Sequence, residues 1–172
     1  MLLENETIKL RALEPEDLDL LYMWENQATF WIVGNTRQPY SKFQLKQYLL
    51  QADLNLYENL QLRLIIEQKS DSKAVGTVDL FDFDIHNSRI ALGLFVDKAF
   101  QGKGIAKSAL QLVEEYVFSF LKVNQLYCHI AESNIASRTM FEKLGYEKNG
   151  ILKNWIKGIN GFEDIVVFQR FK

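Results

Sequence analysis

The segment from Gln101 to Ala106 has the composition of a phosphate-binding loop. Its two glycines, Gly102 and Gly104, follow a predicted strand and precede a predicted long helix. Glycine lets a backbone approach a ligand closely, and the first amides of a helix have no acceptor within the helix. The positive end of the helix dipole also attracts an anion. The segment therefore predicts a pyrophosphate site, with Lys103 and Lys107 available to assist.

The glycine pattern of this segment differs from two common nucleotide-binding motifs. A dinucleotide-binding motif has a third glycine and a following acidic residue that holds the ribose, and both are missing here. The segment also lacks the spacing of a P-loop. A Rossmann domain and ATP or GTP hydrolysis are therefore disfavoured, and another compound that contains a pyrophosphate is expected.

Hydrophobic periodicity predicts the elements that position this loop. A strand is expected from Thr7 to Ala12, and Pro15 is suited to the first turn of a helix. Ser41 and Gln44 have the spacing of a capping box, which predicts a second helix. Further strands are expected over residues 62–66, 75–83, 89–96 and 126–130, helices over 105–120 and 134–144, and a C-terminal hairpin that turns at 160–161. The order of elements predicts an α+β fold with mixed strand pairing.

The composition limits the classes of function. The chain has 172 residues, of which 48% are hydrophobic, and no linker interrupts it, so a single domain over 1–172 is expected. A formal charge of -2 disfavours nucleic acid as a partner. Cys128 is the single cysteine, and neither a cluster of metal ligands nor a run of about 20 apolar residues occurs. Neither a metal nor a membrane is expected, and because the N-terminus does not read as a signal peptide, a cytoplasmic location is the default expectation.

The phosphate-binding segment resembles the acetyl-CoA signature of the GNAT superfamily, Arg/Gln-x-x-Gly-x-Gly/Ala, at its usual junction of strand and helix. Asn134, Ser137 and the segment 141–146 resemble the family's downstream Asn and its aromatic-x-Lys-Leu-Gly-aromatic segment. The resemblance runs from Lys9 to the C-terminal hairpin. It is greatest for the branch of ribosomal-protein N-terminal acetyltransferases and spermidine acetyltransferases, and it implies a mixed, mainly antiparallel sheet of six to seven strands flanked by helices.

The resemblance implies acetyl-CoA as the co-substrate. Backbone groups of residues 94–96 would contact the pantetheine arm, residues 101–107 would hold the pyrophosphate, and Asn134 and Lys143 would lie near the cofactor. The cofactor-binding residues that it implies are Leu94, Phe95, Val96, Gln101, Gly102, Lys103, Gly104, Ile105, Ala106, Lys107, Asn134 and Lys143.

The same resemblance implies direct transfer of the acetyl group to an amine in a ternary complex. A backbone N–H near Phe95 or Val96 would stabilise the oxyanion. Phe141 stands where many relatives have the tyrosine that protonates the leaving thiolate, and phenylalanine has no proton to give. Ser137, which matches a serine of the ribosomal-protein branch, is the preferred acid, although a serine in a first helical turn often bonds local backbone. Asp79 is the candidate base.

The acceptor amine is predicted to be a protein N-terminal α-amine, with a polyamine as the nearest alternative. Phe141 and Ser137 favour the first, whereas the acidic residues Asp79, Asp82 and Asp84, together with Glu25, favour a small polycation. A non-catalytic CoA-binding module is the alternative from another class.

Several other residues are expected to be structural. Cys128 and His129 are neighbours on a strand and point to opposite faces, which disfavours a thiol–imidazole pair. Four aromatic residues, Trp31, Tyr40, Phe43 and Trp155, are assigned to the core rather than to a substrate wall. A homodimer is one possible assembly, in which the apolar strand 165–168 pairs or packs with a second copy of the chain. The same strand could equally lie inside one sheet.

Overall fold

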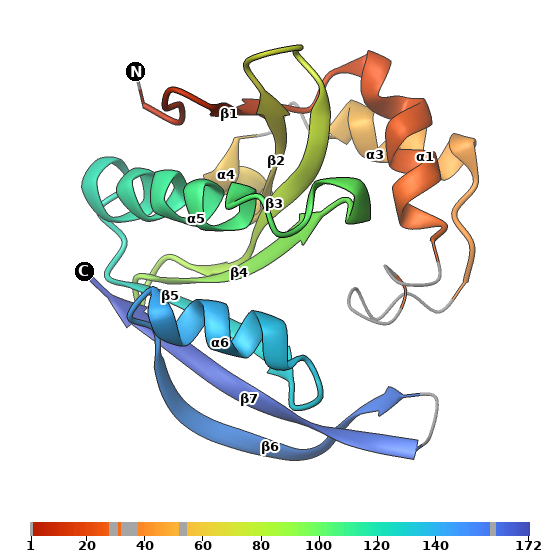
Figure 1. The fold of residues 1–172 in the computed structure, drawn as a ribbon. Coiled ribbons are helices and arrows are strands. Elements are labelled where there is room, and N and C mark those ends of the chain that lie inside the picture. The colour runs from red at the N-terminus through yellow and green to blue at the C-terminus, as the bar shows by residue number, and fades with distance from the viewer. Residues whose placement is uncertain (1, 28–30, 32–37, 52–54, 159–160) are drawn as a thin grey trace.

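One sheet contains the seven strands of this computed structural model, which describes residues 2–27, 31, 38–51, 55–158 and 161–172. The strand order is β1-β2-β3-β4-β5-β7-β6 (Figure 1). Strands β4 and β5 are parallel, and the other neighbours are antiparallel, which confirms the predicted mixed, mainly antiparallel sheet. The strands are β1 Ile8–Ala12, β2 Leu62–Gln68, β3 Ala74–Asp84, β4 Arg89–Val96, β5 Gln125–Ala131, β6 Glu147–Gly158 and β7 Gly161–Phe171.

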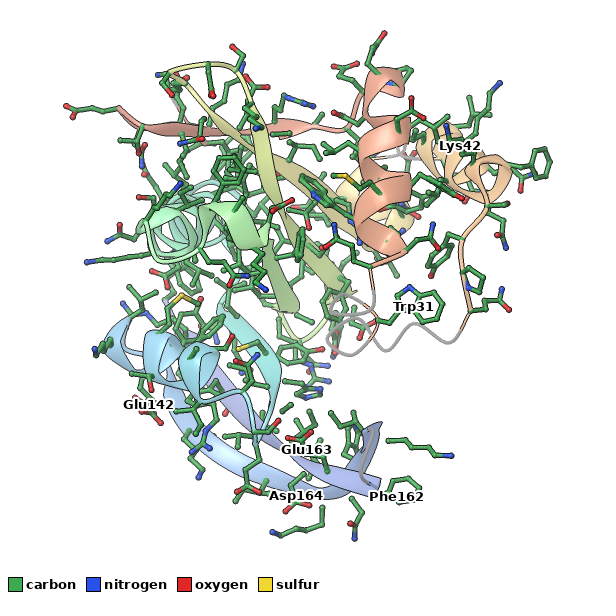
Figure 2. All side chains as sticks on the ribbon, turned by 45° about the vertical axis from the view of Figure 1, so that its right-hand side comes forward. Trp31, Lys42, Glu142, Phe162, Glu163 and Asp164 are labelled. Carbon is green, nitrogen blue, oxygen red and sulfur yellow. The ribbon has the colours of Figure 1, made fainter. Side chains whose placement is uncertain are left out.

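Helices cover both faces of the sheet. Figure 1 shows α5 and α6 on one side and α1 and α3 on the other. In Figure 2, Glu142 on α6 and Trp31 next to α1 mark these two sides. The helices are α1 Leu18–Glu25, α3 Lys42–Gln51, α4 Leu56–Asn59, α5 Ile105–Glu115 and α6 Ile135–Lys143, with short 3-10 turns at Pro15–Asp17 and Lys98–Phe100 and a π turn at Tyr116–Phe120.

Local signals account for several helix ends. The Ser41 hydroxyl accepts a hydrogen bond from the Gln44 amide at 3.1 Å, and the Gln44 side chain accepts one from the Ser41 amide at 2.9 Å, so the predicted capping box starts α3. Pro15 opens the 3-10 turn that leads into α1. Gly145 follows α6 with a φ of 83°, a left-handed conformation that favours glycine. The C-terminal turn is predicted at 160–161, and residue 160 lies outside the described residues.

The main core lies between the sheet and α5. Alternate residues of β4, including Ile90 and Leu92, are buried against apolar residues of α5 such as Leu110 and Val113. Burying apolar surface is worth about 25 cal/mol per Å², so this face supplies most of the driving force that docks α5 on the sheet. The opposite residues of β4 point toward α1, because the rings of Phe95 and Trp24 meet edge to face with their centroids 5.4 Å apart.

The pairing of β4 and β5 covers only the beginning of each strand. Arg89 to Ala91 pair with Gln125 to Tyr127, and beyond this point the two strands have no recorded pairing with each other. β4 continues to Val96 and β5 continues to Ala131. The two parallel strands therefore separate toward their carboxyl ends, and the segment 101–106 and α6 follow these ends in the chain.

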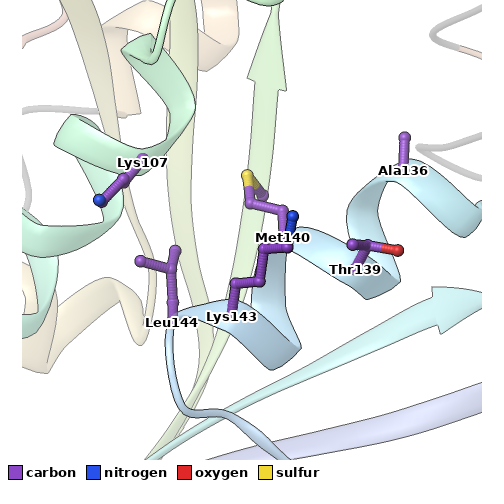
Figure 3. Close-up of a pocket in the computed structure, with 6 residues that line it drawn as sticks. All are labelled: Lys107, Ala136, Thr139, Met140, Lys143 and Leu144. Atoms are coloured by element: carbon purple, nitrogen blue, oxygen red, sulfur yellow. The ribbon is translucent and has the colours of Figure 1, made fainter.

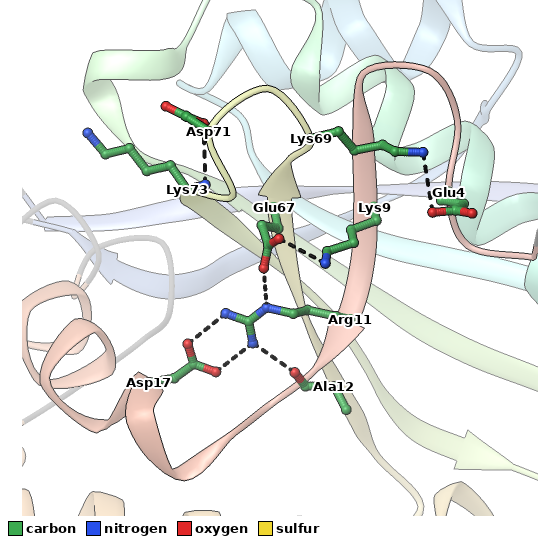
Figure 4. Close-up of polar contacts among 9 residues, drawn as sticks. All are labelled: Glu4, Lys9, Arg11, Ala12, Asp17, Glu67, Lys69, Asp71 and Lys73. Atoms are coloured by element: carbon green, nitrogen blue, oxygen red, sulfur yellow. Dashed lines mark hydrogen bonds and ion pairs between the residues drawn. The ribbon is translucent and has the colours of Figure 1, made fainter.

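An ionic network joins the N-terminal helices to the sheet (Figure 4). The Arg11 guanidinium contacts both oxygens of Asp17 at 2.7 and 2.8 Å and Glu67 Oε2 at 2.6 Å, while Lys9 reaches Glu67 Oε1 at 2.9 Å. Burial raises the pKa of Asp17, but hydrogen bonds from Arg11 and the Glu14 amide outweigh it, and the pKa lies below its ordinary value. Asp17 is therefore ionised at neutral pH, and the network fixes α1 on the β1–β2 edge.

Two assignments of aromatic residues to the core are wrong. The Phe43 side chain is 69% exposed and that of Trp155 is 60% exposed, because α3 and β6 each present one face to solvent. Tyr40 and Trp31 are half-buried. Pairing of the strand 165–168 with another chain is also excluded, since β7 lies inside the sheet between β5 and β6. In the described part of the chain, no helix has the length and apolar character that crossing a membrane requires.

Candidate active site

The segment 101–106 connects the end of β4 to the first turn of α5. Gly102 and Gly104 have φ angles of 75° and 77°, in the left-handed region where glycine carries little strain. A Cβ atom at either position would meet no atom within 4 Å, so the outer side of the loop is open. No described residue accepts a hydrogen bond from the amides of Lys103 or Ile105. The loop thus presents free donors at the positive end of a helix, as an anion requires.

The side chain of Gln101 fixes the loop to the sheet. Its amide Nε2 donates a hydrogen bond of 2.9 Å to the carbonyl oxygen of Val96. The Gln101 backbone N–H donates to the carbonyl oxygen of Lys98 at 3.4 Å, so Gln101 supports the loop, and the free amides are those of Lys103 and Ile105.

Asp97 fixes the other side of the loop. One carboxylate oxygen accepts a hydrogen bond of 3.0 Å from the indole of Trp24, and the second accepts one of 3.0 Å from the amide of Ala99. Trp24 is 1% exposed and also contacts Phe95. The end of β4, the loop 101–106 and α1 consequently hold fixed positions relative to one another.

A pocket of about 320 Å³ lies between α5 and α6 (Figure 3). Lys107 on α5 and Lys143 on α6 both line it, so the structure brings together two predicted cofactor-binding residues that are far apart in the sequence. None of its lining side chains is acidic, which suits a phosphorylated ligand. The remaining lining residues, which lie on α6 or at its C-terminal end and were not predicted to bind the cofactor, are Ala136, Thr139, Met140 and Leu144.

Asn134 caps α6 and holds Ser137 in place. The Asn134 side-chain oxygen accepts a hydrogen bond of 3.1 Å from the amide of Ser137. Ser137 is half-buried, and its hydroxyl makes no hydrogen bond to another described residue. Phe141, one turn further on, is 4% exposed and packs edge to face on Tyr146 at 4.8 Å. The Phe141 ring is thus a core group, whereas the Ser137 hydroxyl is left free to donate.

Asp79 belongs to an ionic cluster that the sequence did not indicate. Its Oδ1 accepts a hydrogen bond from Arg63 Nε, its Oδ2 accepts one of 3.3 Å from the Thr77 hydroxyl, and Arg63 also pairs with Glu25. The Arg63 guanidinium lies 5.5 Å from the centre of the Tyr48 ring. Both carboxylates are therefore paired with one cation, so the cluster keeps one negative charge but has no unpaired carboxylate. They do not form the free anionic mouth that their sequence positions suggested.

The two acidic residues that follow on β3 differ in their partners. Asp84 Oδ2 pairs with Arg89 at 3.0 Å, and the same carboxylate accepts hydrogen bonds from the amide and side chain of Asn87. Asp82 has no hydrogen bond or ion pair with another described residue and sits at a β-bulge with a φ of 50°. Of the four acids considered for a polycation, only Asp82 has a free carboxylate.

Cys128 and His129 point to opposite faces of β5, as predicted. Cys128 is 4% exposed in the core, and burial raises the pKa of its thiol to about 12, so it is not a nucleophile at neutral pH. His129 is exposed on the opposite face. Within the described ranges, no three His, Cys, Asp or Glu side chains are placed to hold a metal ion.

The chain belongs to the GNAT acetyltransferases, because the family model of the acetyltransferase (GNAT) domain matches residues 7–147. It is 28% identical to the spermidine N(1)-acetyltransferase of Escherichia coli K12, over 85% of this chain and 76% of that protein. It is 27% identical to the putative ribosomal N-acetyltransferase YdaF of Bacillus subtilis, over 98% and 93% of the two chains. The spermidine N-acetyltransferase of Vibrio cholerae, solved with CoA and spermine, has the same fold, with a TM-score of 0.88, 21% identity and coverage of 97% and 96%.

Membership of this family makes the chain an acyltransferase that uses acetyl-CoA. A non-catalytic CoA-binding module is therefore disfavoured. The residues present suit this co-substrate, because open amides, left-handed glycines and a pocket with two lysines lie along one side of α5 and α6. The predicted motifs identified the loop and α6, but the Arg63 cluster was missed because Arg63 looks like any polar residue on an alternating strand.

Proposed function

We propose that residues 1–172 form one catalytic domain that transfers the acetyl group of acetyl-CoA to the N-terminal α-amine of a protein or peptide. The observation that carries the choice of acceptor is that Glu25 and Asp79 are both paired with Arg63, so neither carboxylate is free to bind an ammonium group. A polycation needs several free carboxylates in its site, whereas a single amine at the end of an uncharged segment does not. The chain from Asn26 to Ser41 contains no acidic residue either.

The proposed chemical roles follow from the positions of the groups. Backbone amides of the loop 101–106 and the lysines 107 and 143 bind the phosphates, and backbone groups near Phe95 and Val96 orient the thioester. Ser137 donates a proton to the departing thiolate, since its hydroxyl is half-buried and has no other acceptor among the described residues. Asp79 stays a candidate base, but both of its oxygens are already hydrogen-bonded.

A polyamine is the second candidate acceptor. It is favoured by the similarity to the spermidine N(1)-acetyltransferase of Escherichia coli. Asp82, with its free carboxylate on the open face of β3, is the residue best placed to attract a second ammonium group.

A panel of acceptors tests the proposal. Acetyl-CoA is mixed with peptides that have a free N-terminus, the same peptides with a blocked N-terminus, and spermidine or spermine, and the release of thiol and the mass of each product are recorded. Acetylation of the free N-terminal peptides alone is the expected result. Turnover of spermidine without peptide turnover would select the second candidate, and no product with any amine would overturn the proposed activity.

We further propose a cytoplasmic location and assembly as a homodimer. The internal position of β7 leaves β6 as the accessible edge at the C-terminal end of the sheet. The mass of the purified protein in solution, measured by light scattering, tests the assembly, and a monomer would contradict it.

A further inference from the structure

His129 lies on β5 just beyond the point where β4 and β5 cease to pair. Tyr127 is the last residue of β5 paired with β4, and its partner is Ala91. Paired residues of parallel strands point to the same face of a sheet, and every second residue along a strand shares a face. His129 therefore faces the same side as Phe95, which contacts α1, and the opposite side from the core that holds α5.

This placement sets an imidazole beside the opening between the two strands. The phosphate-binding loop and the pocket of Lys107 and Lys143 lie on the side of α5 and α6. An amine that reaches the thioester from the other side of the sheet arrives on the face of His129. The imidazole is exposed there, so it is accessible to a substrate or to a bridging water.

The groups around His129 leave it as the best proton acceptor of its surroundings. The Tyr127 ring lies 5.8 Å away, and the nearest partner on β7 is Val167, which is apolar. Asp82 on β3 acts electrostatically on both His129 and Tyr127. Burial, followed by the charge of Asp82, raises the pKa of Tyr127, so its phenol stays protonated at neutral pH. Asp79, the other candidate, already accepts two hydrogen bonds.

We infer that His129 accepts the proton that the acceptor amine loses during acetyl transfer, directly or through one water. The amine nitrogen forms the new C–N bond, the C–S bond of the thioester breaks, one proton passes from the nitrogen to the imidazole, and another passes from an acid to the thiolate. With a neutral amine, the products are the amide, the free thiol, the imidazolium and the conjugate base of the acid, so atoms and charge balance. A proton that passes from the imidazolium to that base through water restores the enzyme. This role rests on the proposed acetyltransferase activity.

The protonation state of His129 suits the role. Partial desolvation lowers the pKa of the imidazole below its ordinary value of 6.5, while the charge of Asp82 opposes this effect. His129 is therefore neutral and able to accept a proton at pH 7. Activity that depends on the neutral form is complete above this pKa and is lost as the pH falls through it. This loss forms the acid limb of the plot of kcat/KM against pH. Because the titrating group belongs to the enzyme, the position of this limb is independent of the amine used.

The test measures kcat/KM between pH 5 and 8 with two amines of different pKa, for the natural protein and for His129→Gln. We expect kcat/KM of His129→Gln to fall about 100-fold at pH 7.5, as for the loss of a general base, with unchanged affinity for CoA. His129→Glu should recover at least tenfold of this loss and move the acid limb to lower pH, since a carboxylate has an ordinary pKa near 4.3. The control is His86→Gln, which removes the other histidine of the chain and should change nothing.

A His129→Gln variant with natural kcat/KM and an unchanged acid limb would overturn the inference. If the His129 variants do not fold, an NMR titration of the natural protein gives the pKa of His129. The His129 signal is assigned by comparison with His86→Gln, which has a single imidazole. A pKa for that signal that differs from the acid limb of kcat/KM would also overturn it. Absence of product from the natural protein with every amine would instead refute the proposed function, so the two failures are distinct.

Discussion

The side-chain amide of Gln101 lies 2.9 Å from the carbonyl oxygen of Val96 and donates a hydrogen bond to it. This bond joins the first residue of the loop 101–106 to the last residue of β4. The glycines of the loop are left-handed and open to solvent, so they supply free amides but little rigidity. The position of the amides relative to the sheet thus depends on side chains at the ends of the loop.

Replacement of Gln101 by Leu is expected to weaken the binding of acetyl-CoA about fivefold. The substitution removes a hydrogen bond worth about 1 kcal/mol that fixes the loop before the ligand arrives. Isothermal titration calorimetry with CoA measures the effect. Gln111→Leu, on the exposed face of α5, is the matched control and should bind normally. Equal affinity of the Gln101 variant and the natural protein would show that the loop is held by other contacts.

Replacement of Gly104 by Glu is expected to abolish most of the CoA affinity. Its φ of 77° makes any side chain costly by about 1–2 kcal/mol, and a carboxylate adds repulsion toward a pyrophosphate. Gly104→Ala separates the two effects, because its Cβ meets no neighbour within 4 Å and adds only the conformational cost. We expect the Glu variant to bind at least tenfold more weakly than the Ala variant at equal stability. The pyrophosphate site would be misplaced if both variants bound CoA equally.

Replacement of Ser137 by Ala is expected to lower kcat about tenfold and to leave the affinity for CoA nearly intact. A general acid speeds turnover by protonating the leaving group. Because a thiolate is a weaker base than most leaving groups, the loss of its proton donor should slow turnover only modestly. Ser133→Ala, four residues earlier and exposed, is the matched control. The kcat of both variants at saturating acetyl-CoA provides the measurement, and unchanged turnover would remove Ser137 from the mechanism.

Replacement of Arg63 by Met is expected to lower the free energy of unfolding by about 3–5 kcal/mol, since it leaves two carboxylates without their cation. The Arg63 and Glu25 side chains are 17% and 8% exposed, so water compensates only in part. Urea denaturation measures the change. Lys153→Met breaks the ion pair with Asp164, in which the lysine side chain is 72% exposed, and is expected to have little effect.

A triple variant distinguishes loss of charge balance from loss of packing at the Arg63 cluster. If Glu25→Gln and Asp79→Asn are added to Arg63→Met, the unpaired charges disappear while the shapes of the carboxylate side chains remain. Recovery of more than half of the lost stability is the expected result. Stability as low as in the single variant would assign the effect to the contact of Arg63 with the Tyr48 ring.

Local signals in the sequence were sufficient for most elements. The capping box at Ser41, Pro15 at a first turn and the strand–glycine–helix order of 89–120 each involve neighbours within a few residues, so their physical effect is visible in a linear reading. Solvent exposure was harder to predict. Phe43 and Trp155 are exposed because of where α3 and β6 lie in the fold, and no local pattern records that placement.

The sequence by itself determined the strand–glycine–helix segment 101–106, the order of strands and helices around it, and the absence of an acidic proton on the Phe141 side chain. Tertiary structure alone decided which charges meet. Arg63 lies 38 residues from Glu25 and 16 from Asp79, and Lys107 and Lys143 come together only when α5 and α6 line one pocket. Electrostatic interactions depend on distance in space, which chain separation does not encode, so the pairing of both acids with Arg63 and the exposure of His129 could be recognised only in the folded protein.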